Sequence, residues 1–192
     1  MPECEESVEG FVLAGGMSRR MGRDKALLPF RGRTLIEHVA GAVREAAGSA
    51  VLVGPPERYA RLGFPVVADE RPGMGPLGGI VTALGVARSG WILAAACDLP
   101  GLTGPFLSEM LARWREQAGD ADCFVPQSSG GVEPLCAVWR VAALPRLRCA
   151  LNERRLKMKE VIGKLNARVW PVADARWFRN VNTPLDWASE HA

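Results

Sequence analysis

The sequence predicts an α/β fold: a Rossmann-like, mostly parallel β-sheet with helices on both faces. Short apolar runs typical of strands alternate along the chain with segments of helical periodicity, as in strand–helix–strand units. The 192 residues, of which 48% are hydrophobic and 23% charged, have the size and composition of one globular domain. Because no linker, repeat or low-complexity segment interrupts the chain, we expect a single domain over residues 1–192.

In the first half of the chain, strands are predicted over 10–14, 51–53, 65–68 and 91–97. A helix should begin at Thr34, which forms a capping box with Glu37, and extend to about residue 47. A second helix is predicted over 77–87. Thr103 should cap a third helix, whose apolar positions 106, 107, 110, 111 and 114 would face the core.

The second half of the chain is less regular. Strands are predicted over 123–126 and 133–139, joined through residues 128–131, and a last strand over 168–172. Helical periodicity occupies 141–164. Thr183-Pro184 should open a terminal helix, because proline is favoured at the first helical position.

Composition excludes several classes of function. No segment is long and apolar enough to span a bilayer, and the acidic start Met1–Glu6 is unlike a signal peptide, so we expect a cytoplasmic protein without a membrane partner. The net charge of +3 and the lack of aromatic residues among the basic ones argue against nucleic acid. Five cysteines without a Cys-x-x-Cys pair, and only two histidines, argue against disulfides, thiolate zinc sites and Ser-His-Asp chemistry.

One glycine-rich segment carries the strongest chemical signal. The first predicted strand leads into Gly15-Gly16, and the next nine residues hold Ser18, Arg19, Arg20, Gly22, Arg23, Asp24 and Lys25. Glycines let main-chain N–H groups approach an anion, and fixed cations neutralise the charge that develops during phosphoryl or nucleotidyl transfer. The spacing matches neither the dinucleotide-binding nor the Walker A pattern.

The segment resembles the signature of the molybdenum cofactor guanylyltransferase (MobA) family, Leu-Ala-Gly-Gly-x-Ser-x-Arg-Met-Gly-x-Asp-Lys, which residues 13–25 match position by position. Three further family elements follow in the expected order: Gly75-Pro76-Leu77-Gly78-Gly79, an Asp-x-Pro at 98–100, and Asn180-Val181-Asn182-Thr183-Pro184. The resemblance implies a nucleotide-diphospho-sugar transferase-like fold and a nucleotidyltransferase that uses GTP.

Asp98 follows the predicted central strand 91–97, at the sheet edge where α/β proteins bind ligands. A carboxylate there can hold Mg²⁺, which takes one or two carboxylates plus phosphate oxygens; the alternative is an aspartate that starts a turn. The resemblance implies that Asp98 is the metal ligand, and that Lys25 and Arg20 are catalytic with it. Solvated loop charges are the alternative for Lys25 and Arg20.

The resemblance also implies a nucleotide site. Asp69 follows the third predicted strand, and the loop at 75–79 would lie over the base and ribose; their alternatives are a capped loop and a simple helix entry. The expected nucleotide-binding residues are Leu13, Ala14, Gly15, Gly16, Gly22, Lys25, Asp69, Gly75, Pro76, Leu77, Gly78 and Asp98.

Acceptor contacts are expected from Asn180, Asn182, Arg154 and Arg155, although turn formation and a solvated basic face explain these residues as well. Glu133-Pro134-Leu135 resembles the family's short strand beside the acceptor pocket. The family usually has an asparagine after the second strand. This chain has Gly54 there, which removes one side-chain contact near the base.

The implied reaction is transfer of GMP from GTP to the phosphate of molybdenum-molybdopterin, giving the guanine dinucleotide cofactor and pyrophosphate. GTP and the molybdopterin cofactor would be the substrates, Mg²⁺ the cofactor, and other cofactor-synthesis proteins or molybdoenzymes transient partners. Three alternatives stay open: a cytidylyltransferase on the same acceptor, a nucleotidyltransferase for another phosphomonoester such as a sugar phosphate, and a non-catalytic nucleotide-binding scaffold. Ala14-Gly15-Gly16, where cytidylyltransferases usually have Ala-Ala-Gly, favours GTP.

Overall fold

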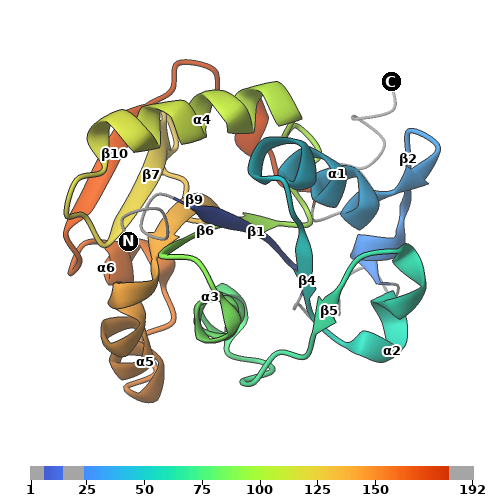
Figure 1. The fold of residues 1–192 in the computed structure, drawn as a ribbon, viewed down its shortest axis with the longest axis horizontal. Helices are drawn as coiled ribbons and strands as arrows, with labels where there is room; N and C mark the ends of the chain where they lie inside the picture. Colours follow the sequence, from blue (N-terminus) through green and yellow to red (C-terminus); the bar gives the residue numbers. More distant parts are fainter. Residues whose placement is uncertain (1–6, 15–23, 182–192) are drawn as a thin grey trace.

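The computed structural model describes residues 7–14 and 24–181. These residues form a sheet in the order β5-β4-β1-β6-β9-β7-β10, with β8 paired to β7 (Figure 1). The strands are β1 (Val8–Leu13), β4 (Val51–Val53), β5 (Val66–Val67), β6 (Trp91–Ala96), β7 (Cys123–Ser128), β8 (Gly131–Val132), β9 (Cys136–Arg140) and β10 (Ala167–Pro171).

Within this sheet β1, β4, β5 and β6 are parallel, and β10 is parallel to β7, whereas β9 runs antiparallel to both β6 and β7. Leu13 is in register with Val53 of β4 and Ala96 of β6. The carboxyl ends of these three strands are therefore level with one another, which makes one edge of the sheet the place where their following loops meet. This confirms the predicted α/β fold with a mostly parallel sheet.

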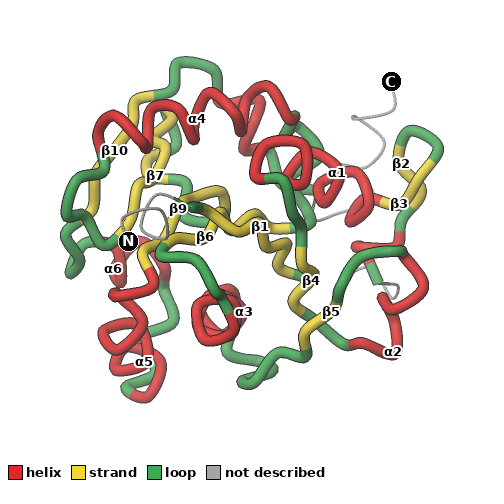
Figure 2. The backbone as a smooth tube through the Cα atoms, in the orientation of Figure 1, coloured by secondary structure: helices red, strands yellow, loops and turns green. Residues whose placement is uncertain are grey.

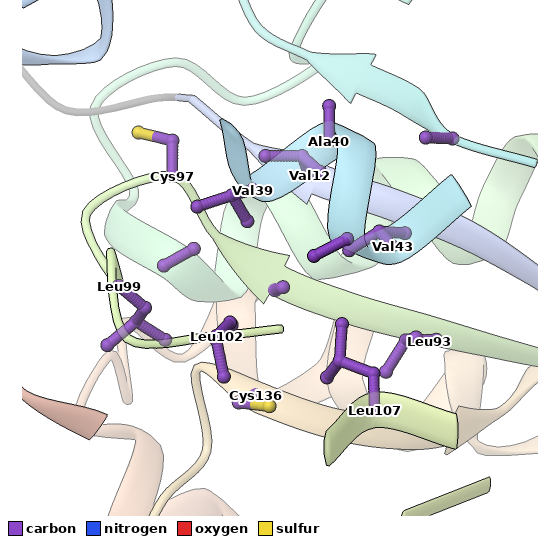
Figure 3. Close-up of a cluster of buried hydrophobic side chains, with 14 of the residues drawn as sticks. Val12, Val39, Ala40, Val43, Leu93, Cys97, Leu99, Leu102, Leu107 and Cys136 are labelled. Carbon is purple, nitrogen blue, oxygen red and sulfur yellow. The ribbon is translucent and has the colours of Figure 1, made fainter. Parts of the chain in front are cut away.

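Helices cover both faces of the sheet (Figures 1 and 2). One face packs against α1 (Leu35–Ala47) and α4 (Gly104–Gln117), and the other against α3 (Gly75–Val86), α5 (Leu144–Asn152) and α6 (Met158–Ile162). Successive strand residues alternate between the two clusters: Val12 packs toward Val39 and Val43 of α1 (Figure 3), whereas Phe11 and Leu13 belong to the opposite cluster. Both faces are thus apolar, as the continuous apolar strands predict.

The predicted caps are confirmed. Thr34 accepts a bond from Glu37 N, and the Glu37 carboxylate accepts one from Thr34 N at 2.8 Å. Thr103 caps α4 by accepting from Phe106 N at 3.4 Å. The helix predicted from residue 77 begins earlier, at Gly75, whose φ of +65° is a conformation that favours glycine.

Other boundaries are corrected by the structure. Residues 133–135 form a turn in place of a strand, with Cys136 N bonded to Glu133 O at 3.2 Å, and β9 starts only at Cys136. The helical stretch 141–164 is broken at 153–157, where Arg154 has a φ of +55°. The prediction missed the hairpin of β2 (Pro29–Phe30) and β3 (Arg33–Thr34), and α2 (Pro56–Tyr59).

The helix expected from Thr183-Pro184 lies outside the described residues. Within the described part of the chain, every helix is too short or too polar to cross a membrane.

Candidate active site

The carboxyl ends of β1 and β6 border a cavity of about 220 Å³. Main-chain bonds continue the strand pairing past the strand ends: Ala14 N donates to Val53 O at 2.9 Å, and Cys97 N to Leu13 O at 3.1 Å. The backbone on both sides of the cavity is therefore fixed by the sheet. The cavity is lined by Leu13, Ala14, Asp24, Lys25, Ala26, Gly75, Pro76, Ala96, Cys97, Asp98 and Leu135.

Lys25 and Asp98 face each other in this cavity. Lys25 lies in the short helix η1 (Lys25–Leu27), and its Nζ donates to Asp98 Oδ2 at 2.5 Å. The two side chains are only 20% and 12% exposed, so the pair is held with little screening by water. The structure thus brings together the two described residues for which the family resemblance implies a catalytic role.

Asp98 suits a magnesium site that is completed by substrate. Among the described residues, no three His, Cys, Asp or Glu side chains gather in a way that would hold a metal ion. Mg²⁺ needs no such cage, because it commonly binds one or two carboxylates together with phosphate oxygens and water. The buried Asp98 carboxylate, which lines the cavity, has the donor chemistry for that ion.

Hydrogen bonds to main-chain carbonyl oxygens hold the segment 98–100 in place. Val181 N donates to Asp98 O at 3.0 Å, and the Val181 side chain is buried. This bond brings the exposed residue Asn180 next to the Asp98 segment, while Asn182 lies outside the described residues. His38 Nε2 lies 3.0 Å from Pro100 O, and burial lowers the pKa of His38.

The Gly75–Gly79 element contributes to the cavity and to packing. Gly75 and Pro76 line the cavity, whereas Leu77 and Gly78 are buried behind it. A Cβ on Gly78 would approach Arg71 O to 2.9 Å, so the glycine lets α3 pack closely against the preceding loop.

Asp69 anchors that same loop. Its Oδ1 accepts bonds from Arg71 N at 2.9 Å and from Thr82 Oγ1 at 3.2 Å. Asp69 is not among the cavity-lining residues. Its assignment to the nucleotide site stays a prediction.

The structure does not bring Arg154 and Arg155 to the cavity. Arg154 is exposed, and Arg155 Nη2 pairs with Glu153 Oε2 at 2.5 Å. Arg155 lines a separate hollow of about 210 Å³ together with Arg146 and Lys164. Their role in acceptor binding stays a prediction. Gly15, Gly16, Arg20 and Gly22 lie outside the described residues.

Tyr59 is the residue that sequence reasoning missed. Its side chain is 1% exposed, and its hydroxyl donates toward Asp24 Oδ2 at 2.9 Å and Ala14 O at 3.3 Å. Burial, reinforced by the Asp24 carboxylate, raises the pKa of Tyr59, so the phenol stays protonated. The sequence signal for this packing was the glycine at position 54, where the family usually has an asparagine. A Cβ on Gly54 would lie 2.8 Å from Tyr59 Cε2, so the glycine makes room for the Tyr59 ring.

Three of the described cysteines, Cys97, Cys123 and Cys136, are buried, while Cys149 is exposed. Cys97 lines the cavity, but burial, with the neighbouring Asp98 charge, raises its pKa. A protonated thiol is a poor nucleophile. The site is therefore suited to direct transfer between bound substrates rather than to a covalent cysteine intermediate.

Comparison with known proteins identifies the family of this chain. The model of the MobA-like NTP transferase domain family matches residues 10–169. The chain belongs to this family. A probable molybdenum cofactor guanylyltransferase of Deinococcus radiodurans is 36% identical over 179 residues, which cover 92% of this chain and 90% of the relative.

Solved structures show the same fold. Molybdopterin-guanine dinucleotide biosynthesis protein A from Archaeoglobus fulgidus superposes with a TM-score of 0.79 at 27% identity, covering 95% of this chain and 96% of the other. Rv0371c from Mycobacterium tuberculosis, solved as a complex with manganese, gives a TM-score of 0.69 at 19% identity and covers 96% and 97% of the two chains. The protein is thus a nucleotidyltransferase of the nucleotide-diphospho-sugar transferase fold.

Proposed function

We propose that this NTP transferase transfers GMP from GTP to the phosphate of molybdenum-molybdopterin, forming the guanine dinucleotide cofactor and releasing pyrophosphate. The observation that carries the proposal is the Lys25–Asp98 pair in the cavity at the ends of β1 and β6. The curated relative from Deinococcus radiodurans, which shares 36% of its residues with this chain over nearly the full length, is named for the same activity.

The reaction is an in-line displacement at the α-phosphorus of GTP. An oxygen of the acceptor phosphate forms the new P–O bond as the bond to the pyrophosphate oxygen breaks, so no covalent enzyme intermediate is needed. Lys25 would stabilise the negative charge that grows on the leaving pyrophosphate, and Arg20 would act with it. The sheet-fixed backbone at Ala14 and Cys97 would keep the cavity from reshaping during transfer.

Asp98 would hold Mg²⁺, which supplies charge neutralisation between the phosphates when bound. The Lys25 ammonium touches the Asp98 carboxylate in this structure. Lys25 and Asp98 would therefore act together on the phosphates of the nucleotide, Lys25 by its charge and Asp98 by holding the metal ion. We place this activity in the cytoplasm, with transient contacts to other proteins that make or receive the cofactor.

Gly54 does not argue against a guanine nucleotide. Tyr59 occupies the space where a side chain at position 54 would begin, so the missing asparagine is replaced by packing. Base selection then depends on Ala14-Gly15-Gly16 and on the Gly75–Gly79 element, and the small residues of Ala14-Gly15-Gly16 favour a purine.

Nucleotide selectivity tests the proposal. Purified protein is incubated with Mg²⁺, molybdopterin and either GTP, CTP or ATP, and the dinucleotide and pyrophosphate are measured by chromatography. We expect product with GTP, formed at least about 10²-fold more slowly by an Asp98→Ala variant. Calorimetry should show tighter binding of GTP than of CTP or ATP. Equal binding of all three nucleotides, or product from CTP alone, would overturn the assignment to guanylyl transfer.

A further inference from the structure

Tyr59, the only tyrosine of the chain, contacts two cavity residues that are ten positions apart in the sequence. Its hydroxyl lies 2.9 Å from Asp24 Oδ2 and 3.3 Å from the carbonyl oxygen of Ala14. Ala14 and Asp24 both line the cavity that holds Lys25 and Asp98. One buried phenol thus joins the end of β1 to the residue that precedes the catalytic lysine.

The ring of Tyr59 is fixed in place by its surroundings. A Cβ added to Gly54 would lie 2.8 Å from Tyr59 Cε2 and 3.3 Å from the Ala14 Cβ, so the ring fills the space beside the glycine. Gly54 in turn is held by the sheet, because its N–H donates to Val67 O at 2.9 Å. A ring packed this closely gives its hydroxyl a defined position.

Asp24 links the position of the Tyr59 hydroxyl to that of Lys25. Its Oδ1 accepts from Ala26 N at 3.1 Å and so caps the short helix that begins with Lys25. Its Oδ2 accepts from Tyr59, and the neighbouring Lys25 places its ammonium on Asp98. A continuous series of contacts therefore runs from the Tyr59 hydroxyl through Asp24 to the Lys25–Asp98 pair.

A second side chain contacts the same carboxylate from outside. Arg58 Nη1 lies 3.2 Å from Asp24 Oδ2, but the Arg58 side chain is 57% exposed. Exposed ion pairs contribute little, because water screens them and the long side chain loses entropy. The Tyr59 hydroxyl belongs to a buried side chain and donates to a charged acceptor that is only 16% exposed, which makes its bond the stronger of the two.

We propose that Tyr59 is a positioning residue for nucleotidyl transfer: its hydroxyl holds Asp24 and Ala14 so that the Lys25 ammonium stays at the Asp98 side of the cavity. This role rests on the proposed function, because it assigns Tyr59 to the efficiency of that same site. Since Lys25 is expected to act on charge that develops in the transition state, its displacement should affect kcat more than nucleotide binding.

The test compares Tyr59→Phe, which removes only the hydroxyl, with Arg58→Ala, which removes the exposed contact to the same oxygen. We expect Tyr59→Phe to lower kcat by about three- to tenfold, as for the loss of one hydrogen bond, with the KM for GTP within about twofold of wild type. Arg58→Ala should change kcat by less than about twofold. A role in folding alone would lower the unfolding temperature and leave kcat intact, which would overturn the proposal.

A double variant tests whether Tyr59 acts through Asp24. In an Asp24→Ala background, the further change Tyr59→Phe should lower kcat little, because the hydroxyl has lost its main acceptor. If the two substitutions multiply their effects on kcat, Tyr59 acts by another route and the proposal is overturned.

A readout without turnover separates this proposal from the proposed function. The rate at which an amine-specific acylating reagent modifies Lys25 is followed by mass spectrometry in the three proteins. It should rise several-fold in Tyr59→Phe, whose ammonium is held less firmly, and stay near wild type in Arg58→Ala. If wild type transfers no GMP, the proposed function fails while the labelling rates still decide for or against Tyr59. Equal labelling rates in all three proteins would overturn the positioning role.

Discussion

Lys25 and Asp98 are 73 positions apart in the sequence, yet Lys25 Nζ lies 2.5 Å from Asp98 Oδ2. They meet because β1 and β6 are neighbours in the sheet, with Leu13 in register with Ala96 and Cys97 N bonded to Leu13 O. A cation and a carboxylate at adjoining strand ends give one site both a phosphate contact and a metal ligand.

Replacing Asp98 should stop metal-dependent turnover. We expect Asp98→Ala to lower kcat by about 10²-fold or more at any Mg²⁺ concentration, because no second described carboxylate lines the cavity except Asp24, which is engaged by Tyr59. The fold should survive, since Asp98 lies just past the end of β6. Steady-state rates over a Mg²⁺ titration and a circular dichroism spectrum check both points. An unchanged rate at saturating Mg²⁺ would remove Asp98 from the mechanism and direct attention to Asp69.

Replacing Lys25 should separate catalysis from binding. Lys25→Ala is expected to lower kcat by roughly 10²–10³-fold, the range for loss of one preorganised charge-stabilising donor. The affinity for GTP, measured by calorimetry, should fall much less, because other groups would still hold the phosphates. If GTP affinity fell in full proportion to kcat/KM while kcat stayed intact, Lys25 would be a uniform binding contact and the catalytic role would be wrong.

The central half of the fold and the Asp98 position could be predicted from sequence because they depend on local patterns. The apolar run 91–97 is long enough to read as a buried strand, and the carboxyl ends of parallel strands meet at one edge. The turn at 133–135 could not be predicted in this way, because Leu135 continues without a break into the apolar run of 136–139, and only the Glu133–Cys136 bond shows that the strand starts later.

Residue roles that depend on tertiary contacts were also beyond the sequence. From the sequence, Gly54 indicates only the loss of a side-chain contact near the base. The structure shows that the Tyr59 ring fills the space beside this glycine. In the sequence, Arg155 is one residue of a basic run. The packing of α5 and α6 determines where the loop between them places this side chain, and Arg155 lines the hollow with Arg146 and Lys164 rather than the active-site cavity. Local pattern therefore located the chemistry, while packing determined which neighbours support it.

Asp122 should contribute to stability at the edge of the sheet opposite the site, where β6 begins. Its side chain is buried, accepts from Asn166 N at 2.9 Å and pairs with Arg146. We expect Asp122→Ala to lower the free energy of unfolding by about 1–3 kcal/mol, because the Asn166 N–H and the Arg146 guanidinium lose their acceptor. Urea denaturation measures the change.

The matched control for Asp122 is its exposed neighbour. Asp120 is exposed, and its Oδ1 accepts a long bond of 3.4 Å from Asn166 Nδ2 at the surface. Asp120→Ala should change the free energy of unfolding by less than about 0.5 kcal/mol. Equal effects of the two substitutions would show that burial of Asp122 does not matter.

His38 should make folding stability depend on pH. Burial lowers its pKa below the usual value of 6.5, with smaller contributions from Arg31 and Arg33, while the Pro100 carbonyl acts in the opposite sense. The unfolded chain therefore binds a proton on this ring at a higher pH than the folded protein does. The stabilisation is complete above pH 6.5 and is lost as the pH falls from there toward the lower pKa of the folded state.

The comparison that isolates His38 is between wild type and His38→Gln, each unfolded with urea at about pH 8 and about pH 5.5, which bracket the histidine titration. The free energy of unfolding of His38→Gln should be lower than that of wild type at both pH values. The variant loses the imidazole ring, whose centroid lies 4.8 Å from that of Phe30 in an edge-on contact. The loss of stability on acidification, however, should be larger in wild type than in the variant, since only wild type carries the buried ring. The loss of unfolding free energy between the two pH values in wild type, minus the same loss in His38→Gln, is the contribution of His38. The subtraction removes the effect of carboxylates that titrate in both proteins. If acidification destabilised both proteins equally, protonation of His38 would not be linked to folding.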